Sequence, residues 1–381
     1  MKVHPGSKMC KSSQWRLLGT ALIVVVAALT TARATEPAAN VVIWDTQSRL
    51  GETADIQNRS QWKVVPIDPF TLETDPAKAF SDPGYYGREY AFSGDAVVEN
   101  SHFAAAFRSA TGQVAVYSKT DVQQQVLTVS LPNARPDRCS ILRNTGGEAA
   151  VEFVSEKGLS VVLAFDRTEI IAVRPGTGVK GIRIQSSIDY GVAPDFIADD
   201  LIIAPAQYSS ASTLTVPAES LFLGLLTGEN RVLAMTWPQA KQQMRLGLGS
   251  PQQGTRRIES IEFETDGQSV YLALLEAPGI WHREPLTASF LEKDVTIAWK
   301  RPFPARWITQ LEESGLKTTF PFRQVKGQIW RGVSGMLTYP VWFDGDKACY
   351  RLSKKVTPRG ESLVYCLEGD DSPVPVDTPV D

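Results

Sequence analysis

Hydrophobic and polar residues alternate along most of this chain with a period of two, which is the period of a β-strand with one buried face. Turn residues separate the alternating runs, and several runs end at a glycine. The runs that predict strands are Val41–Asp45, Trp62–Ile67, Gln113–Tyr117, Val126–Leu131, Ala150–Val154, Leu159–Phe165, Glu169–Val173, Gly181–Gln185, Leu201–Ala204, Leu221–Leu226, Arg231–Trp237, Ile258–Glu264, Val270–Leu275 and Val295–Trp299.

Helical periodicity is scarce by comparison. The longest helical candidate is Ala305–Ser314, in which Trp307, Ile308 and Leu311 share one helical face and Gly315 is a suitable stop. Many short strands with few helices predict a mainly β protein with a large antiparallel β-sandwich architecture and few short helices.

The length of the chain exceeds that of one ordinary domain, and we expect two packed sandwich units. The boundary falls between 186 and 216, where a polar, proline-containing stretch is a linker or a wide loop. The predicted division is an N-terminal unit over 41–200 and a C-terminal unit over 201–368. Residues 369–381 contain only Gly, Asp, Ser, Pro, Val and Thr, so we expect a disordered tail or a linker to a further module.

The N-terminus has the pattern of a secretory signal peptide. Basic residues precede an apolar stretch from Leu17 to Leu29, and Ala32-Arg33-Ala34 supplies small residues at a cleavage site. The apolar stretch is shorter than the ~20 residues that a spanning helix needs, so a retained membrane anchor is the weaker alternative. We therefore expect residues 1–34 to be removed and the protein to be exported to the periplasm, the cell envelope or the medium, with no stable membrane span.

Removal of this segment changes the charge of the protein. It takes five of the 39 Lys and Arg and none of the 42 Asp and Glu, which leaves a formal charge of −8. Nucleic-acid binding depends on a basic surface that neutralises phosphates, and no basic run is present. The sequence thus argues against a nucleic-acid partner.

Cysteine usage agrees with export. Cys349–Ser353 and Ser362–Cys366 are strand-like runs separated by a polar segment with Pro358 and Gly360. If the two runs pair directly, Cys349 faces Cys366, and a cross-strand disulfide is expected. The alternative is two free buried thiols, and Cys139 has no evident partner.

Five of the nine tryptophans lie between Trp281 and Trp342, interleaved with arginines and an acidic turn. Indole rings stack on the C–H faces of sugars, and charged groups hydrogen-bond sugar hydroxyls or carboxylates. The pattern predicts a carbohydrate-binding surface, and the alternative is that most of these rings pack in the core. The candidate ligand-binding residues are Trp281, His282, Arg283, Trp299, Arg301, Arg306, Trp307, Trp330, Trp342 and Asp344.

An enzyme is the second hypothesis, although no catalytic motif stands out. The glycine pattern at 176–181 leads into a strand-like run, whereas dinucleotide binding requires a helix there, and the mature chain has only His102 and His282. We therefore predict no cofactor and no metal. A glycoside hydrolase would draw its acid pair from Asp195, Asp199, Asp200 and Glu284, whereas a polysaccharide lyase would use His282, Tyr190 and Arg283.

The third hypothesis is a structural protein of the cell envelope. The sequence leaves open the identity of the ligand, the presence of any catalytic activity and the oligomeric state. The leading hypothesis is an exported protein that binds a polysaccharide, or an accessory module of a carbohydrate-active system.

Overall fold

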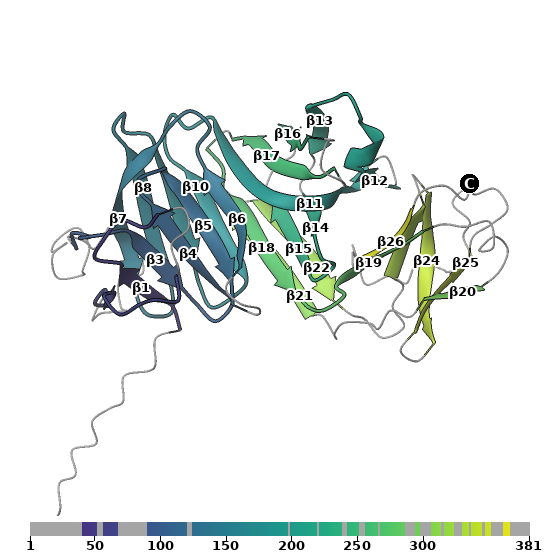
Figure 1. Cartoon of the computed structure of the whole chain (residues 1–381), viewed down its shortest axis with the longest axis horizontal. Coiled ribbons are helices and arrows are strands. Elements are labelled where there is room, and N and C mark those ends of the chain that lie inside the picture. The colour runs from purple at the N-terminus through teal and green to yellow at the C-terminus, as the bar shows by residue number, and fades with distance from the viewer. Residues whose placement is uncertain are drawn as a thin grey trace, which may run out of the picture. The chain divides into compact units, whose positions relative to one another are not determined.

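The chain is mainly β and antiparallel, as the alternating pattern predicts (Figure 1). Within the residues that the computed structural model describes, the one helical element is a 3-10 turn at Pro205–Gln207, and no helix is long and apolar enough to cross a membrane. The described residues are 40–51, 56–67, 90–119, 124–196, 199–218, 221–237, 242–250, 256–265, 267–285, 294–297, 306–313, 316–323, 330–334, 337–344, 347–351 and 361–365.

Eighteen strands form one hydrogen-bonded antiparallel sheet, which divides into two series of neighbours. The first series combines strands that lie before residue 131 with strands that lie after residue 180. In order of pairing, it contains β2 (Lys63–Val64), β1 (Val42–Asp45), β3 (Ala96–Glu99), β4 (Phe103–Arg108), β5 (Gln113–Ser118), β6 (Gln125–Ser130), β11 (Gly181–Phe196), β17 (Ile258–Glu264), β16 (Gln242–Leu248) and β13 (Thr213–Ala218).

The second series pairs in the same antiparallel manner and also includes β11. Its order is β7 (Pro136–Asn144), β8 (Ala149–Ser155), β9 (Ser160–Phe165), β10 (Ile170–Pro175), β18 (Val270–Glu276), β15 (Arg231–Thr236), β14 (Leu221–Leu226), β11 and β12 (Asp199–Ile203).

Strand β11 belongs to both series because it is long enough to change partners. Its first part, from Gly181 to Ile188, pairs with β17 and β6, and its second part, from Ile188 to Phe196, pairs with β14 and β12. Strands before and after position 200 therefore share one sheet, and β10 pairs directly with β18. The pairing of the described strands has no break at the expected unit boundary.

A single apolar core joins the two series. The ring of Phe103 on β4 lies 5.8 Å from that of Phe165 on β9, and the ring of Phe107 lies 4.5 Å from that of Phe153 on β8. All four side chains are buried among Val, Ile and Leu residues from both series. This packing is compatible with the expected sandwich.

Strands β3, β4 and β5 are buried on both faces, which the alternating pattern does not anticipate. Leu50 and Ile56 cover the outer face of these strands, where Ala104, Ala106 and Ala115 leave room for them. Since β4 reads Phe-Ala-Ala-Ala-Phe-Arg, it lacks the β-branched residues that mark a strand. For this reason β4 was absent from the sequence prediction; β3, Ala-Val-Val-Glu, was absent because its four residues are too short an apolar run to show alternation.

The C-terminal strands form a six-stranded sheet and a separate hairpin. The hairpin pairs β21 (Arg306–Glu313) with β22 (Leu316–Arg323), so the predicted helix at Ala305–Ser314 is wrong. Ser-Gly is a dipeptide typical of turns as well as of helix ends, so the sequence at 314–315 is compatible with either interpretation. In order of pairing, the sheet contains β19 (Trp281–Pro285), β26 (Glu361–Tyr365), β23 (Trp330–Ser334), β24 (Leu337–Asp344), β25 (Lys347–Arg351) and β20 (Asp294–Ile297).

The predicted hairpin between the two cysteine-bearing runs is also wrong. Strand β25, which contains Cys349, pairs with β24 and β20, whereas β26 pairs with β19 and β23. Strands β23 and β24 therefore lie between β25 and β26 in the sheet. Each cysteine-bearing strand pairs with other strands, and not with the other cysteine-bearing strand. Cys366 lies outside the described residues, so the disulfide itself remains a prediction. The direct pairing of the two runs, from which the disulfide was expected, does not occur.

Other sequence predictions fall on residues that the structure does not describe. They include the signal peptide at 1–34 and the tail at 369–381.

Candidate functional site

Strand β19 carries the first three predicted ligand-binding residues, Trp281, His282 and Arg283. Its partner β26 places Tyr365 opposite Trp281 and Leu363 opposite Arg283. Trp281, Leu363 and Tyr365 are buried and pack against apolar residues of β14, β15 and β18, including Leu223, Leu225, Val232, Ala234 and Ala273. This contact fixes β19 against the 18-stranded sheet.

Trp281 itself belongs to this second core. Its side chain is fully buried, its indole Nε1 donates a hydrogen bond to the carbonyl oxygen of Leu226 at 3.0 Å, and its ring meets Tyr190 edge to face at 5.9 Å. A buried indole of this kind offers no face to a sugar in the structure. Core packing, the alternative considered for these aromatics, therefore describes Trp281.

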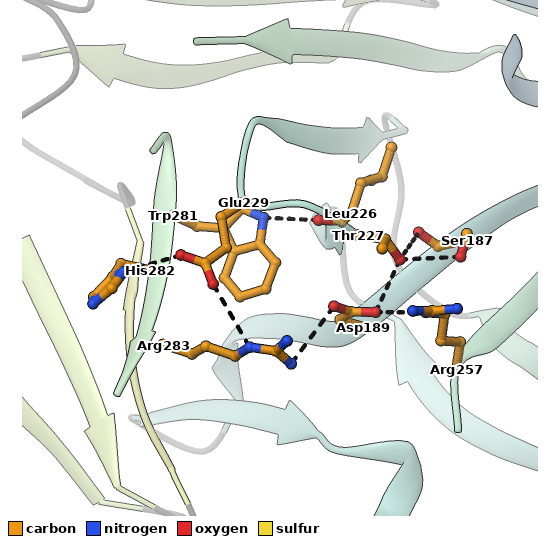
Figure 2. Close-up of polar contacts among 9 residues, drawn as sticks. All are labelled: Ser187, Asp189, Leu226, Thr227, Glu229, Arg257, Trp281, His282 and Arg283. Carbon is orange, nitrogen blue, oxygen red and sulfur yellow. Dashed lines mark hydrogen bonds and ion pairs between the residues drawn. The ribbon is translucent and has the colours of Figure 1, made fainter. Parts of the chain in front are cut away.

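His282 and Arg283 meet one carboxylate, that of Glu229 (Figure 2). The His282 Nδ1 lies 2.9 Å from Glu229 Oε2, and the Arg283 Nε lies 3.6 Å from Glu229 Oε1. Glu229 lies in the turn between β14 and β15, and its carbonyl oxygen also accepts a hydrogen bond from the Trp281 amide at 3.5 Å. One turn residue thus contacts three consecutive residues of β19.

A second carboxylate, Asp189 on β11, continues the chain of charges. The Arg283 guanidinium lies 3.7 Å from Asp189 Oδ2, while Arg257 Nε donates to Asp189 Oδ1 at 2.9 Å. Thr227 also donates its hydroxyl to Asp189 Oδ1 at 2.9 Å, and Thr227 itself contacts Ser187 (Figure 2). Asp189 is a buried anion that orients two arginines.

The Asp189 carboxylate and the arginines that it contacts differ in their exposure to solvent. The Asp189 side chain is only 3 % exposed, whereas the side chains of Arg257 and Arg283 are 40 % and 34 % exposed. His282 and Glu229 are also partly exposed. We call these five residues the β19 charge cluster. It presents cationic donors and a carboxylate acceptor to solvent from side chains whose orientations are already fixed.

Such an arrangement is suited to hydrogen bonding rather than to a metal ion. Both Asp189 oxygens and both Glu229 oxygens face arginine, histidine or threonine groups. Among the residues that the structure describes, no group of three His, Cys, Asp or Glu is placed to hold a metal.

The remaining predicted residues are placed only by their backbone or not at all. Trp299 and Arg301 lie outside the described residues. Arg306 and Trp307 are on β21 in the separate hairpin, whereas Trp330 is on β23 and Trp342 and Asp344 are on β24. In the backbone register, Trp330 is opposite Val341, the neighbour of Trp342 in the chain.

The acids proposed for a hydrolase are likewise placed only by backbone. Asp195 is on β11, Asp199 and Asp200 are on β12, and Glu284 is on β19. For the lyase alternative, Tyr190 contacts Trp281, and Arg283 reaches Asp189, the neighbour of Tyr190 in the chain.

Sequence reasoning missed Glu229, Asp189 and Arg257 as members of the cluster. By sequence alone, Gly228-Glu229-Asn230 has the composition of a turn, and Asp189 is one of four acids between positions 189 and 200. Nothing in their local pattern indicates partners more than fifty residues away. One sequence feature does indicate that acidic partners are present. His282 and Arg283 are adjacent, and such a pair requires acidic partners if it is partly buried.

No protein-family model fits this sequence, and no curated protein is similar to it at a significant level.

Proposed function

We propose that this protein is exported and binds a polysaccharide through the β19 charge cluster. The observation that carries the proposal is the pairing of two partly exposed arginines, Arg257 and Arg283, with the buried carboxylate of Asp189. The buried anion holds both guanidinium groups in place, so little side-chain entropy is lost when they bind a ligand.

Sugar hydroxyls donate and accept hydrogen bonds at once, so they suit a surface that alternates cations with carboxylates. The cluster has this alternation, in the order His282, Glu229, Arg283, Asp189 and Arg257. Glycan carboxylates, where present, would bind the arginines in the bidentate manner. Trp281 supports the site from the core, and other tryptophans of the C-terminal region stack on the sugar rings.

A retention experiment tests the proposal. The mature protein, starting at Thr35, is run in native gels that contain xylan, a soluble cellulose derivative or polygalacturonate. We expect retardation by at least one of these polymers, and its loss in Arg257→Gln and Arg283→Gln. Arg138→Gln is the matched control, because Arg138 is an exposed arginine on β7, outside the cluster. Retardation by no glycan in a wider panel would overturn the proposal.

A lyase is the second candidate function. Tyr190, His282 and Arg283, the residues expected for a proton donor, a base and a carboxylate-binding cation, come from strands that meet around Trp281. In a lyase, the base removes the proton α to the uronate carboxylate and the glycosidic oxygen leaves as a double bond forms. Ultraviolet absorbance from an unsaturated product, released from polygalacturonate or alginate, would favour this activity over binding alone.

Export rests on the N-terminal pattern and is tested separately. We expect intact-mass measurement of the secreted or periplasmic protein to show a chain that starts at Thr35. A full-length mass beginning at Met1 would contradict the proposed processing.

A further inference from the structure

Glu229 has a backbone conformation that glutamate rarely adopts. Its φ is +61°, and only Gln47 among the other described non-glycine residues also has a positive φ. In this region the Cβ of an L-residue lies too close to the neighbouring carbonyl oxygen, which is why glycine and asparagine are preferred there. The preceding residue, Gly228, has a φ of +95° and suits the turn.

The side chain of Glu229 provides the contacts that a glycine or asparagine at this position would lack. Its two oxygens lie against His282 Nδ1 and Arg283 Nε, at 2.9 Å and 3.6 Å. The link to Trp281, by contrast, uses the Glu229 carbonyl oxygen and needs no side chain. The turn can therefore remain attached to β19 without the carboxylate.

We infer that Glu229 is a positioning residue, which orients His282 and Arg283 toward the ligand at a cost in backbone strain. The inference rests on the proposed function, since positioning has meaning only if the cluster binds a ligand. Glu229 needs no contact with the ligand for this role. A strained residue at a cluster of fixed charged groups is the pattern expected where function has outweighed stability.

The test separates positioning from a structural role. Glu229→Gly and Glu229→Asn remove the carboxylate and relieve the positive φ, whereas Glu229→Gln keeps the strain and much of the shape. If the residue positions His282 and Arg283, both relieved variants unfold at the same temperature as the natural protein or higher. Their dissociation constant for the retained glycan, measured by calorimetry, rises by about tenfold or more.

Gln47→Gly is the matched control, because Gln47 has the same φ of 61° in a turn that follows β1, outside the cluster. This variant should gain stability without a change in glycan affinity. Two results overturn the inference: unchanged affinity in Glu229→Gly, or reduced affinity that is accompanied by lower stability. If the natural protein and Gln47→Gly bind no glycan, the proposed function fails and the inference fails with it.

Discussion

The indole Nε1 of Trp281 donates a hydrogen bond to the backbone carbonyl of Leu226 at 3.0 Å, at the point where β19 meets the turn after β14. The ring is buried, so its polar atom requires a partner, and the carbonyl supplies one. This bond orients β19, and with it the side chains of His282 and Arg283.

Replacement of Trp281 therefore acts on stability. We expect Trp281→Ala to lower the free energy of unfolding by about 3 to 5 kcal/mol, because it opens a large cavity. Trp281→Phe should lower the free energy of unfolding less, since an aromatic ring remains and only part of the side-chain volume and one hydrogen bond are lost. Urea unfolding measures both. If Trp281→Phe removed glycan retention at unchanged stability, the indole would contact the ligand and its assignment to the core would be wrong.

The hydrogen bonds of Asp45 predict that the protein is less stable at acidic pH. Its buried carboxylate accepts hydrogen bonds from the amides of Gln47, Ser93 and Gly94 and from the Tyr90 hydroxyl. Burial alone would raise the pKa of Asp45, but these hydrogen bonds outweigh it and hold the pKa below its ordinary value.

Because the folded pKa is the lower one, the stabilisation is present above the pKa of the unfolded chain and is lost as the pH falls through the folded value. We expect the free energy of unfolding to decline below about pH 5. Asp45→Asn should be less stable at pH 7 and should show a flatter decline. An equally steep decline in the variant would show that other carboxylates cause it.

Asn100 connects the two series of strands. Its Nδ2 donates to the carbonyl oxygens of Asp166 and Thr168, and its Oδ1 accepts from the amides of His102 and Phe103. Asn100→Asp keeps the acceptor and turns a carboxylate toward two carbonyls, so we expect a loss of about 1 to 3 kcal/mol. The loss is read from urea unfolding.

The control for Asn100 is Asn58→Asp, since the exposed Asn58 bonds to Ser60, two residues away. A similar loss in both variants would argue against the connection between the turns.

Two glycines distinguish close packing from backbone strain. A Cβ on Gly94 would lie 2.3 Å from the Ser48 backbone nitrogen, whereas a Cβ on Gly158 would meet nothing within 4 Å, although its φ is +76°. Gly158→Ala should cost about 1 to 2 kcal/mol from strain alone. Gly94→Ala should cost clearly more, and similar melting temperatures for the two variants would contradict the close approach.

The strands that could be predicted are those with an alternating or continuous apolar run, whether one face is buried, as in β8, or both faces, as in β14. The predicted runs 221–226 and 258–264 coincide with β14 and β17, and burial alternates along β8 and β9. The strands that escaped prediction have other causes. Ala-rich β4 is buried on both faces, and β21 was predicted to be a helix because Trp307, Ile308 and Leu311 have the spacing of one helical face.

The candidate site was predictable in part. The local density of aromatics and arginines directed attention to Trp281, His282 and Arg283. His282 and Arg283 lie in the cluster, and Trp281 lies beside them in the core. Their partners Glu229 and Asp189 were not predictable, because antiparallel pairing between distant strands decides which acids they meet. The same limit explains the wrong pairing of the runs at Cys349 and Cys366: two short strands can pair directly or through neighbours, and the local pattern is identical.

The central claim is that the β19 charge cluster binds a glycan, and one comparison tests it most directly. The natural mature protein and Arg283→Gln are titrated by calorimetry with the polymer that retards the natural protein in gels. Both proteins are first shown to unfold at similar temperatures. We predict saturable binding by the natural protein and affinity at least about tenfold weaker in the variant. Equal affinity of the two proteins would place the binding site elsewhere and contradict the claim.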